Sequence, residues 1–278
     1  MSLKTLLLPY ISRWLFSRQR LLNKRTQAER QRKAKNAPHR VHYFHQVDDP
    51  YSALTVAALP ALLARYDIEL QVHIVDAPPD SAAPERDKLI AYSRVDAERI
   101  ATRYGLTFKD PGQQPAPEAV ATASACLVAN HEAETFAALA SRLTQNLWKT
   151  GTDLFTGIKA PVASASAVNA HKASANALRS QLGHYLGATF FYAGEWYWGI
   201  DRLYHLEQRL QDVQAQRPGV EGVLFPPVAD LSTPVKCINP PPIDFFFSFR
   251  SPYSAIVAER VFRLAELTGA QVNLRYVL

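Results

Sequence analysis

Two short segments carry polar side chains in positions typical of helix starts. They are Asp49–Ser52 (DPYS) and Ser251–Ser254 (SPYS). In each, an oxygen-bearing residue that can cap free backbone amides precedes a proline, which suits the first turn of a helix. The same amides and the positive end of the helix dipole favour an anion. Capping alone also explains both residues, so a structural and a binding role stay open.

Other kinds of site are poorly supported by the residues present. The two cysteines, Cys126 and Cys237, lie far apart, so the chain has no CxxC motif and no zinc-ligand spacing. His42 and His45 fall on opposite faces of a predicted strand, which argues against shared metal binding. There is no Ser-His-Asp or Cys-His set and no glycine-rich phosphate loop. We therefore expect no metal site.

The elements around the first segment form a predicted strand–helix–strand motif. Val41 to His45 is a short apolar strand, and a helix follows from Asp49 to about Tyr66, with a bend at Pro60. Ile68 to Val75 alternates apolar and polar residues and predicts a second strand. Short loops at both joints predict a parallel pair with a right-handed crossover.

The rest of the first 215 residues is mainly helical, with one hairpin near its end. The patterns predict strands at 189–192 and 196–198, and helices at 91–105, 118–150, 169–185 and 201–214, with Asp201 as a helix cap. This order predicts an α/β thioredoxin-like domain at 41–215, with a helical insertion at about 78–186.

The chain also contains an internal repeat at an offset of 202 residues. Asp49–Ala53 aligns with Ser251–Ala255 without gaps, and the apolar residues on both sides align as well. We interpret 216–242 as a proline-rich linker and 243–278 as the strand–helix–strand start of a second thioredoxin-like domain. The chain could be a fragment of a longer protein, or its last segment could be completed by another chain or dock on the first domain.

The N-terminal arm, residues 1–40, differs sharply in charge from the rest. It has eleven Lys and Arg and one acidic residue, giving +10, which leaves −4 for residues 41–278. Apolar residues from Leu3 to Phe16 recur at helical spacing but are too few to cross a bilayer. We predict that residues 1–25 form an interfacial helix at an anionic membrane surface, with a solvated arm or a transit segment as alternatives. Residues from Gln27 to Arg40 are expected to form a linker or the frayed end of that helix. No motif supports a nucleic-acid partner.

Three segments carry a family resemblance. Phe247–Ser254 (FSFRSPYS) resembles the opening of 2-hydroxychromene-2-carboxylate isomerases and kappa-class glutathione transferases, within the DsbA-like thioredoxin-fold superfamily. Gly187–Leu203 is similar to the C-terminal hairpin and helix of that family, and Tyr92–Phe108 to its first inserted helix. The resemblance covers 41–214 and 243–278.

The resemblance implies a glutathione site and a reaction. Glutathione would add to an unsaturated small-molecule substrate, permit bond rotation and leave, with Ser251 as the catalytic residue that holds its sulfur as thiolate. The Ala188-Thr189 loop would pair with the glutathione backbone, and Asp201-Arg202 would lie near its γ-glutamyl group. The other glutathione-binding positions that we carry over are Asp49, Pro50, Tyr51, Trp198, Pro252 and Tyr253.

The chain departs from the family pattern at three places. Asp49 replaces the serine in the first domain, where its charge would repel a thiolate. Ala188 replaces a cis-proline, so we expect a trans peptide there. The second segment has the serine but lacks the loop and the hairpin.

The sequence predicts a glutathione-dependent isomerase or transferase that is cytoplasmic and peripheral to a membrane. The alternatives are a thiol-disulfide oxidoreductase family member, opposed by the lack of a CxxC motif, and a non-catalytic binding or scaffold module. A homodimer is left open.

Overall fold

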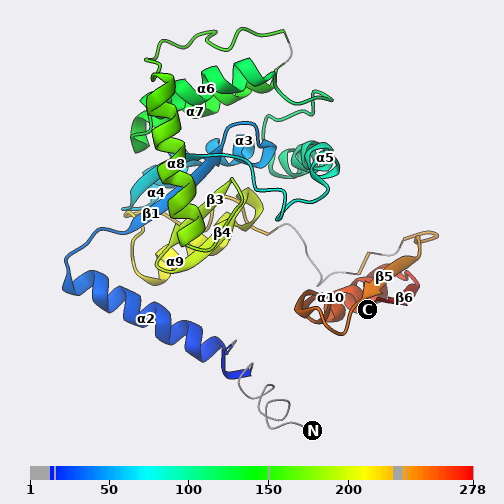
Figure 1. Cartoon of the computed structure of the whole chain (residues 1–278). Coiled ribbons are helices and arrows are strands. Elements are labelled where there is room, and N and C mark those ends of the chain that lie inside the picture. Colours follow the sequence, from blue (N-terminus) through cyan, green and yellow to red (C-terminus); the bar gives the residue numbers. More distant parts are fainter. Residues whose placement is uncertain (1–12, 16, 150, 228–233, 236, 278) are drawn as a thin grey trace. The chain divides into compact units, whose positions relative to one another are not determined.

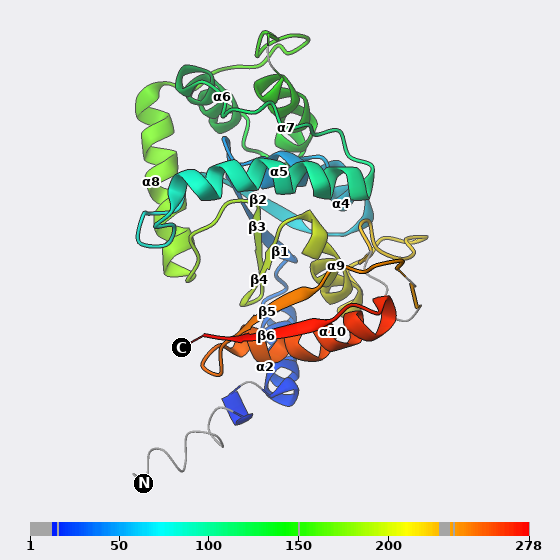
Figure 2. The same cartoon turned by 90° about the vertical axis from the view of Figure 1, so that its right-hand side faces the viewer.

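The computed structural model describes residues 13–15, 17–149, 151–227, 234–235 and 237–277. It divides the chain into two compact units, Met1–Pro226 and Pro227–Leu278. Figures 1 and 2 show the elements of each unit in two views.

The first unit is built on a four-stranded sheet in the order β2-β1-β3-β4. The strands are β1 (Arg40–Gln46), β2 (Glu69–Val75), β3 (Thr189–Tyr192) and β4 (Glu195–Trp198). β1 and β2 are parallel, with Val41 beside Leu70, whereas β3 runs antiparallel to both β1 and β4. Helices α3 (Pro50–Val56) and α4 (Leu59–Arg65) connect β1 to β2. The predicted bend is a break between these two helices, with Pro60 in the first turn of α4.

Four helices are inserted between β2 and β3. They are α5 (Arg86–Tyr104), α6 (Pro117–Ala129), α7 (Ala133–Trp148) and α8 (Ala165–Gln181). In Figures 1 and 2, α6 and α7 lie side by side and α8 runs beside the sheet, where it packs against β2. This sheet order with a helical insertion is the thioredoxin-like α/β fold that the sequence predicts.

The hairpin leads into α9 (Leu203–Asp212) through a 3-10 turn, η1 (Ile200–Arg202). The prediction that Asp201 caps this helix is wrong, because the residue lies within η1 and its carboxylate pairs with Arg202 at 3.0 Å. Gly199 directly precedes the 3-10 turn, so Asp201 lies inside that turn. The residue directly before α9, where a cap would lie, is Arg202.

The core lies where the sheet meets α3, α4, α7 and α9. The Tyr43 ring stacks on Phe190 at a centroid distance of 4.8 Å and meets the edge of Phe136 at 6.3 Å. All three rings are fully buried. The apolar residues that predicted these strands therefore pack the sheet against helices.

The N-terminal arm contacts the sheet and α9 of the first unit through helix α2 (Arg18–Ala34). The guanidinium group of Arg25 makes two hydrogen bonds to Glu195, of 2.7 and 2.6 Å. Arg209 donates to the carbonyl of Arg25 at 3.3 Å. Residues 27–34 are thus regular helix and not linker. The interfacial helix predicted from Leu3 to Phe16 lies outside the described residues except for 13–15.

The second unit contains β5 (Ile243–Phe247), α10 (Pro252–Thr268) and β6 (Val272–Tyr276). β5 and β6 are parallel, and Ile243 lies beside Val272. This pairing reproduces that of Val41 and Leu70 at an offset of 202 residues.

Side chains of helix α8 make hydrogen bonds to backbone groups at the outer edge of β2, near its end. The backbone N–H of Ile74 donates to Nε2 of His171 at 3.1 Å, and that of Asp76 donates to Asn176 at 3.1 Å. Arg179 donates to the carbonyl of Asp76 at 3.0 Å. These contacts satisfy backbone groups that an edge strand otherwise leaves open to other strands.

The histidines at this edge predict a loss of stability in acid. Nε2 of His171 must be unprotonated to accept from Ile74, and Nε2 of His73 lies 3.0 Å from Nδ1 of His42. Burial lowers the pKa of His171, and burial lowers that of His73 to about 4. Because the unfolded chain takes up these protons first, stability is complete above about pH 6.5 and falls as the pH drops toward 4.

We expect the free energy of unfolding to fall by about 1 to 3 kcal/mol between pH 7.5 and pH 4.5. Urea unfolding at several pH values measures this. In His73→Gln the slope should be shallower. An unchanged slope in His73→Gln would show that the buried imidazole does not set the acid limit.

Candidate functional site

A cavity of about 560 Å³ lies between the start of α3 and helix α5. We call it the α3–α5 cavity. Its walls come from the turn after β1, the chain after β2, α5, the loop before β3, and β4. The residues that line it are Gln46, Asp48–Tyr51, Ala77, Pro78, Ala83, Arg86, Leu89, Ile90, Tyr92, Ser93, Asp96, Gln114, Leu186, Gly187 and Trp198. Most are apolar or aromatic, so the cavity suits an organic molecule.

Asp49 both caps α3 and lines this cavity. One carboxylate oxygen accepts from the backbone N–H of Tyr51 at 3.3 Å, and the other from the N–H and the hydroxyl of Ser52, each at 2.8 Å. Burial raises the pKa of Asp49 to about 6, although the bonds from Ser52 oppose the rise. The carboxyl group is therefore mainly ionised at neutral pH and titrates just below it.

Neutral groups support Asp49 from inside the protein. The hydroxyl of Ser52 also accepts from the N–H of Gln46 at 3.2 Å. Tyr43 and His45 are bonded to each other at 3.1 Å, between Oη and Nδ1. Burial holds the pKa of His45 down at about 3, so the ring is uncharged. Burial raises the pKa of Tyr43 well above its usual value, and the negative charge of Asp49 adds to that rise.

Tyr51 and Trp198 form an aromatic wall. Their ring centroids lie 5.2 Å apart, and the angle between the ring planes is 66°. The Tyr51 hydroxyl donates to Asp96 at 2.8 Å. Burial and this carboxylate raise the pKa of Tyr51. Behind the wall, the guanidinium carbon of Arg202 lies 5.1 Å from the Trp198 centroid, and the group pairs with Asp201. The structure therefore brings these four predicted residues together, but Asp201 and Arg202 do not line the cavity.

The loop before β3 lies directly against the start of α3. A Cβ atom on Gly187 would come within 2.6 Å of Cβ of Gln46 and 3.2 Å of Oγ of Ser52. Ala188 and Thr189 are fully buried, and the Ala188 carbonyl accepts from Gly199 at 2.9 Å. Ala188 has a positive φ of 52°, and the described residues contain no cis peptide, as predicted for this loop.

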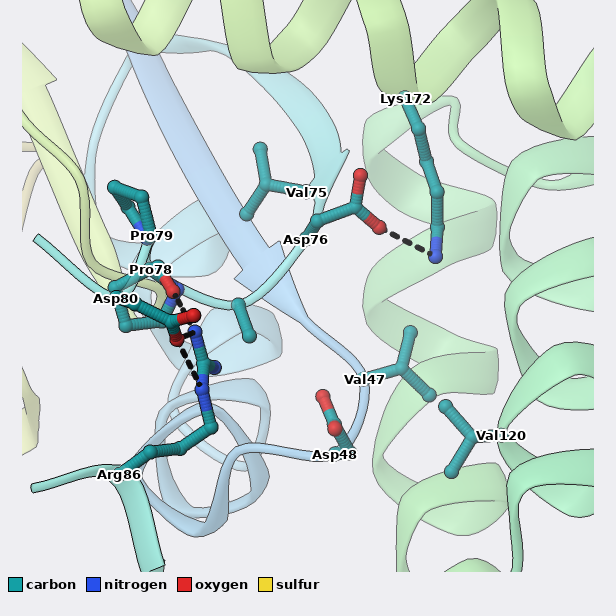
Figure 3. Close-up of a pocket in the computed structure, with 11 residues that line it drawn as sticks. Val47, Asp48, Val75, Asp76, Pro78, Pro79, Asp80, Arg86, Val120 and Lys172 are labelled. Carbon is teal, nitrogen blue, oxygen red and sulfur yellow. Dashed lines mark hydrogen bonds and ion pairs between the residues drawn. The ribbon is translucent and has the colours of Figure 1, made fainter. Parts of the chain in front are cut away.

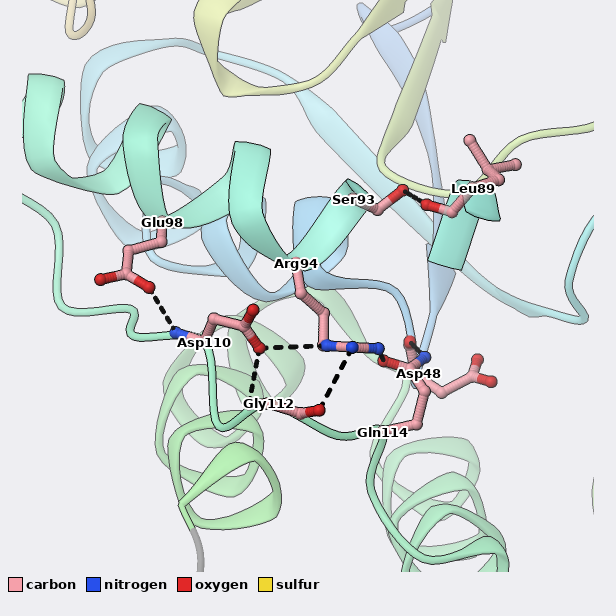
Figure 4. A network of polar contacts seen from close by, with 8 residues as sticks. All are labelled: Asp48, Leu89, Ser93, Arg94, Glu98, Asp110, Gly112 and Gln114. Atoms are coloured by element: carbon pink, nitrogen blue, oxygen red, sulfur yellow. Dashed lines mark hydrogen bonds and ion pairs between the residues drawn. The ribbon is translucent and has the colours of Figure 1, made fainter. Parts of the chain in front are cut away.

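A polar network holds the far side of the cavity in place (Figure 4). Arg94 extends from α5 and donates to Asp110 at 3.0 Å, to the carbonyl of Gly112 at 3.3 Å and to Gln114 at 3.4 Å. Gln114 in turn donates to the carbonyl of Asp48 at 3.0 Å. The segment from Asp110 to Gln114 is thus tied to both α5 and the turn after β1.

A second hollow of about 570 Å³ adjoins the cavity and shares Asp48, Ala77, Pro78 and Arg86 with it. Figure 3 shows Lys172 joined to Asp76 and Arg86 joined to Asp80, whereas Asp48 is drawn without such a partner. Lys172 meets Asp76 at 3.0 Å, and Arg86 pairs with Asp80. The positive groups in this region are therefore engaged within the protein.

Sequence reasoning missed the part of the cavity that α5 supplies. Arg86, Asp96 and Gln114 were not predicted, and neither was Arg94 as the residue that holds the segment to Gln114. Ser93 and Asp96, three residues apart on a predicted helix, were the signal available, because such residues share one helix face.

The second polar segment belongs to the other unit. Ser251 has φ −98° and ψ 120°, which match the −98° and 121° of Asp49. Its side chain makes no capping bond within the part of the chain that the structure describes. Ser254 accepts from the N–H of Ser248 at 3.2 Å, as Ser52 does from Gln46. Pro252 begins α10, and Tyr253 is 80% exposed.

Two kinds of feature are absent from the described residues. No group of three or more His, Cys, Asp or Glu side chains among them could hold a metal ion. Within the same ranges, no helix has the length and apolar character needed to cross a membrane.

Comparison with known proteins adds little to this geometry. No family model and no curated protein matches the chain. One similar solved structure is that of a 2-hydroxychromene-2-carboxylate isomerase, with 16% identity, a TM-score of 0.47, and coverage of 63% of this chain and 95% of that chain. The sheet order and the inserted helices of this chain decide its fold class. The first unit has a thioredoxin-like fold with a helical insertion. Such a fold supports many chemistries, so function depends on the site.

Proposed function

We propose that this chain is a DsbA-like protein of the glutathione-dependent isomerase or transferase type, and that the α3–α5 cavity of its first unit binds a small organic molecule. The cavity itself is the observation that carries the proposal. It lies where α3 begins and the loop before β3 approaches, and rings and aliphatic side chains form most of its lining. Its volume of about 560 Å³ is in the range that holds a small molecule.

Glutathione is proposed to bind through Ser251 and not through Asp49. The hydroxyl of Ser251 makes no capping bond among the described residues, so it is available to a ligand, whereas Asp49 would place a negative charge beside a thiolate. In the expected reaction the sulfur adds to one carbon of a conjugated double bond, the resulting single bond rotates, and the sulfur leaves as the double bond forms again. Glutathione is not consumed.

We propose further that the second unit is the start of a second copy of the first. The shared register of the parallel strands and the matching Ser254 and Ser52 bonds support this. The described part of this copy consists of one strand–helix–strand motif, β5-α10-β6.

A glutathione titration by calorimetry tests these assignments. Asp49→Ser gives the first unit the serine that Ser251 supplies in the second, so we expect it to create a glutathione site in the first unit. That site should bind at least tenfold more tightly than the Asp49 form, because the substitution removes a like charge worth about one pKa unit or more. Serine also keeps the ability to cap α3. Any binding by the unchanged chain should be lost in Ser251→Ala.

Asp87→Asn is the matched control, since Asp87 is exposed on α5, outside the cavity, and the variant loses the same charge. A gain in Asp87→Asn equal to that in Asp49→Ser would mean that net charge, and not the position of Asp49, governs the affinity.

A non-catalytic binding module is the second candidate, and Asp49 and Ala188 favour it because each replaces a residue of the family site. Turnover of an unsaturated substrate with glutathione separates it from the enzyme. Dithiol oxidoreductase chemistry is disfavoured. Cys126 is buried on α6, where burial raises its thiol pKa, and Cys237 is an exposed residue of the other unit. Membrane association through residues 1–25, a cytoplasmic location and a homodimer stay predictions.

A further inference from the structure

The α3–α5 cavity has carboxylates that pair with no cation among the described residues. Asp48, Asp49 and Asp96 all line it, and none takes part in an ion pair within the described ranges. Their hydrogen-bond donors are neutral. Gln46 donates to Asp48 at 3.0 Å, and Tyr51 donates to Asp96 at 2.8 Å.

The positive groups nearby are engaged elsewhere. Arg86 lines the cavity, but it pairs with Asp80 and donates to the carbonyl of Pro78 at 2.8 Å. Arg94 is held by Asp110, and Arg202 by Asp201. A partly buried charge without an opposite charge is costly, so a ligand that brings a positive group would offset this cost.

The rest of the cavity fits the apolar part of such a ligand. Leu89 and Ile90 give it an aliphatic side, and Tyr51, Tyr92 and Trp198 give it aromatic rings. Aromatic faces attract both flat apolar groups and organic cations. The aromatic walls are a feature independent of the carboxylates, and both favour the same class of molecule.

We infer that the α3–α5 cavity selects an organic cation, a hydrophobic or aromatic amine, whose ammonium group pairs with Asp49. The inference rests on the proposed function, because it names the ligand class of the same cavity. It also explains why an anion such as a thiolate would be rejected there. Asp49 is the charge partner best placed for this role, since it stands at the cavity wall and accepts hydrogen bonds from the neutral groups of Tyr51 and Ser52.

Three probes of nearly the same shape test the inference by calorimetry at pH 7.5. They are 1-naphthylmethylamine, 1-naphthylmethanol and the anion of 1-naphthaleneacetic acid. They carry a positive, a neutral and a negative group on one ring system. We expect the amine to bind at least tenfold more tightly than the alcohol, and the carboxylate to bind most weakly. In Asp49→Asn the amine should lose most of this advantage while the affinity for the alcohol stays the same.

Two further measurements keep the test sharp. Asp49→Ser loses the same charge but retains a capping oxygen, so it replaces Asp49→Asn if that variant folds poorly. Asp87→Asn, on α5 but outside the cavity, should behave like the unchanged chain. The preference for the amine should also weaken as the pH falls below 6, because Asp49 then takes up a proton. The other titratable groups around it are those of Asp48, Asp96, Tyr43 and Tyr51.

The outcomes separate this inference from the proposed function. If the alcohol binds as tightly as the amine, the cavity holds small molecules without selecting a cation, and only the inference is wrong. If the amine keeps its advantage in both Asp49 variants, Asp49 is not its partner and the inference fails as stated. If none of the three probes binds, the cavity is not a small-molecule site, and the proposed function fails with the inference.

Discussion

Gly187→Ala is expected to lower the free energy of unfolding by about 2 to 3 kcal/mol, in the range measured for overpacked sites. The added Cβ would lie 2.6 Å from Cβ of Gln46, which real structures do not allow, so the loop before β3 must move away from the start of α3. Because Gly187 also lines the cavity, the same movement should weaken the binding of every probe by tenfold or more. Urea unfolding and calorimetry measure the two effects.

Gly105→Ala is the control for this substitution. A Cβ on Gly105 would meet nothing within 4 Å, but its φ is +66°, so only the cost of the left-handed conformation applies, about 1 kcal/mol. Gly105 does not line the cavity, so ligand affinity should not change. Equal losses of stability in the two variants would mean that the close approach at Gly187 relaxes without cost.

Phe136→Ala is expected to cost about 3 to 5 kcal/mol of stability, the largest effect of a single truncation that we predict. The ring is fully buried, and it meets Tyr43 and His45 at centroid distances of 6.3 and 5.5 Å. Its removal leaves a hole between α7 and the sheet, next to the side chains of Tyr43 and His45. The midpoint and slope of urea unfolding measure the loss.

Two variants bracket that result. Phe136→Leu keeps most of the buried volume and should lose less than half as much stability. Thr135→Ala changes the neighbouring residue, which is exposed, and should lie within about 0.5 kcal/mol of the unchanged chain. A small loss in Phe136→Ala would show that α7 does not pack firmly on the sheet.

The sheet and the start of α3 could be predicted because their signals are local. The apolar run from Val41 to His45 reflects a strand buried on both faces, and the alternation from Ile68 to Val75 reflects one buried face. Asp49-Pro50 contains both a cap and a first-turn proline. Each signal lies within a few neighbouring residues. The order of strands and helices then leaves few topologies.

Half of the candidate site could not be predicted, because its contacts join distant parts of the chain. Tyr51 and Asp96 are 45 residues apart, and Gln114 and Asp48 are 66 apart. Nothing in one sequence marks such pairs as neighbours. Asp201 was misassigned for the opposite reason, since the local pattern fits a cap but the turn at Gly199 places the residue in η1.

The contacts between α8 and β2 set an order of events during synthesis. The three backbone contacts at Ile74 and Asp76 join residues 97, 100 and 103 positions apart, so β2 leaves the ribosome well before the helix that closes its edge. At a synthesis rate of about 5 to 20 residues per second, the delay is about 5 to 20 seconds. β3, which pairs with β1, follows α8 in the chain and comes later still. The nascent sheet therefore has two unpaired edges throughout this interval, and a chaperone or a crowded polysome would meet it in that state.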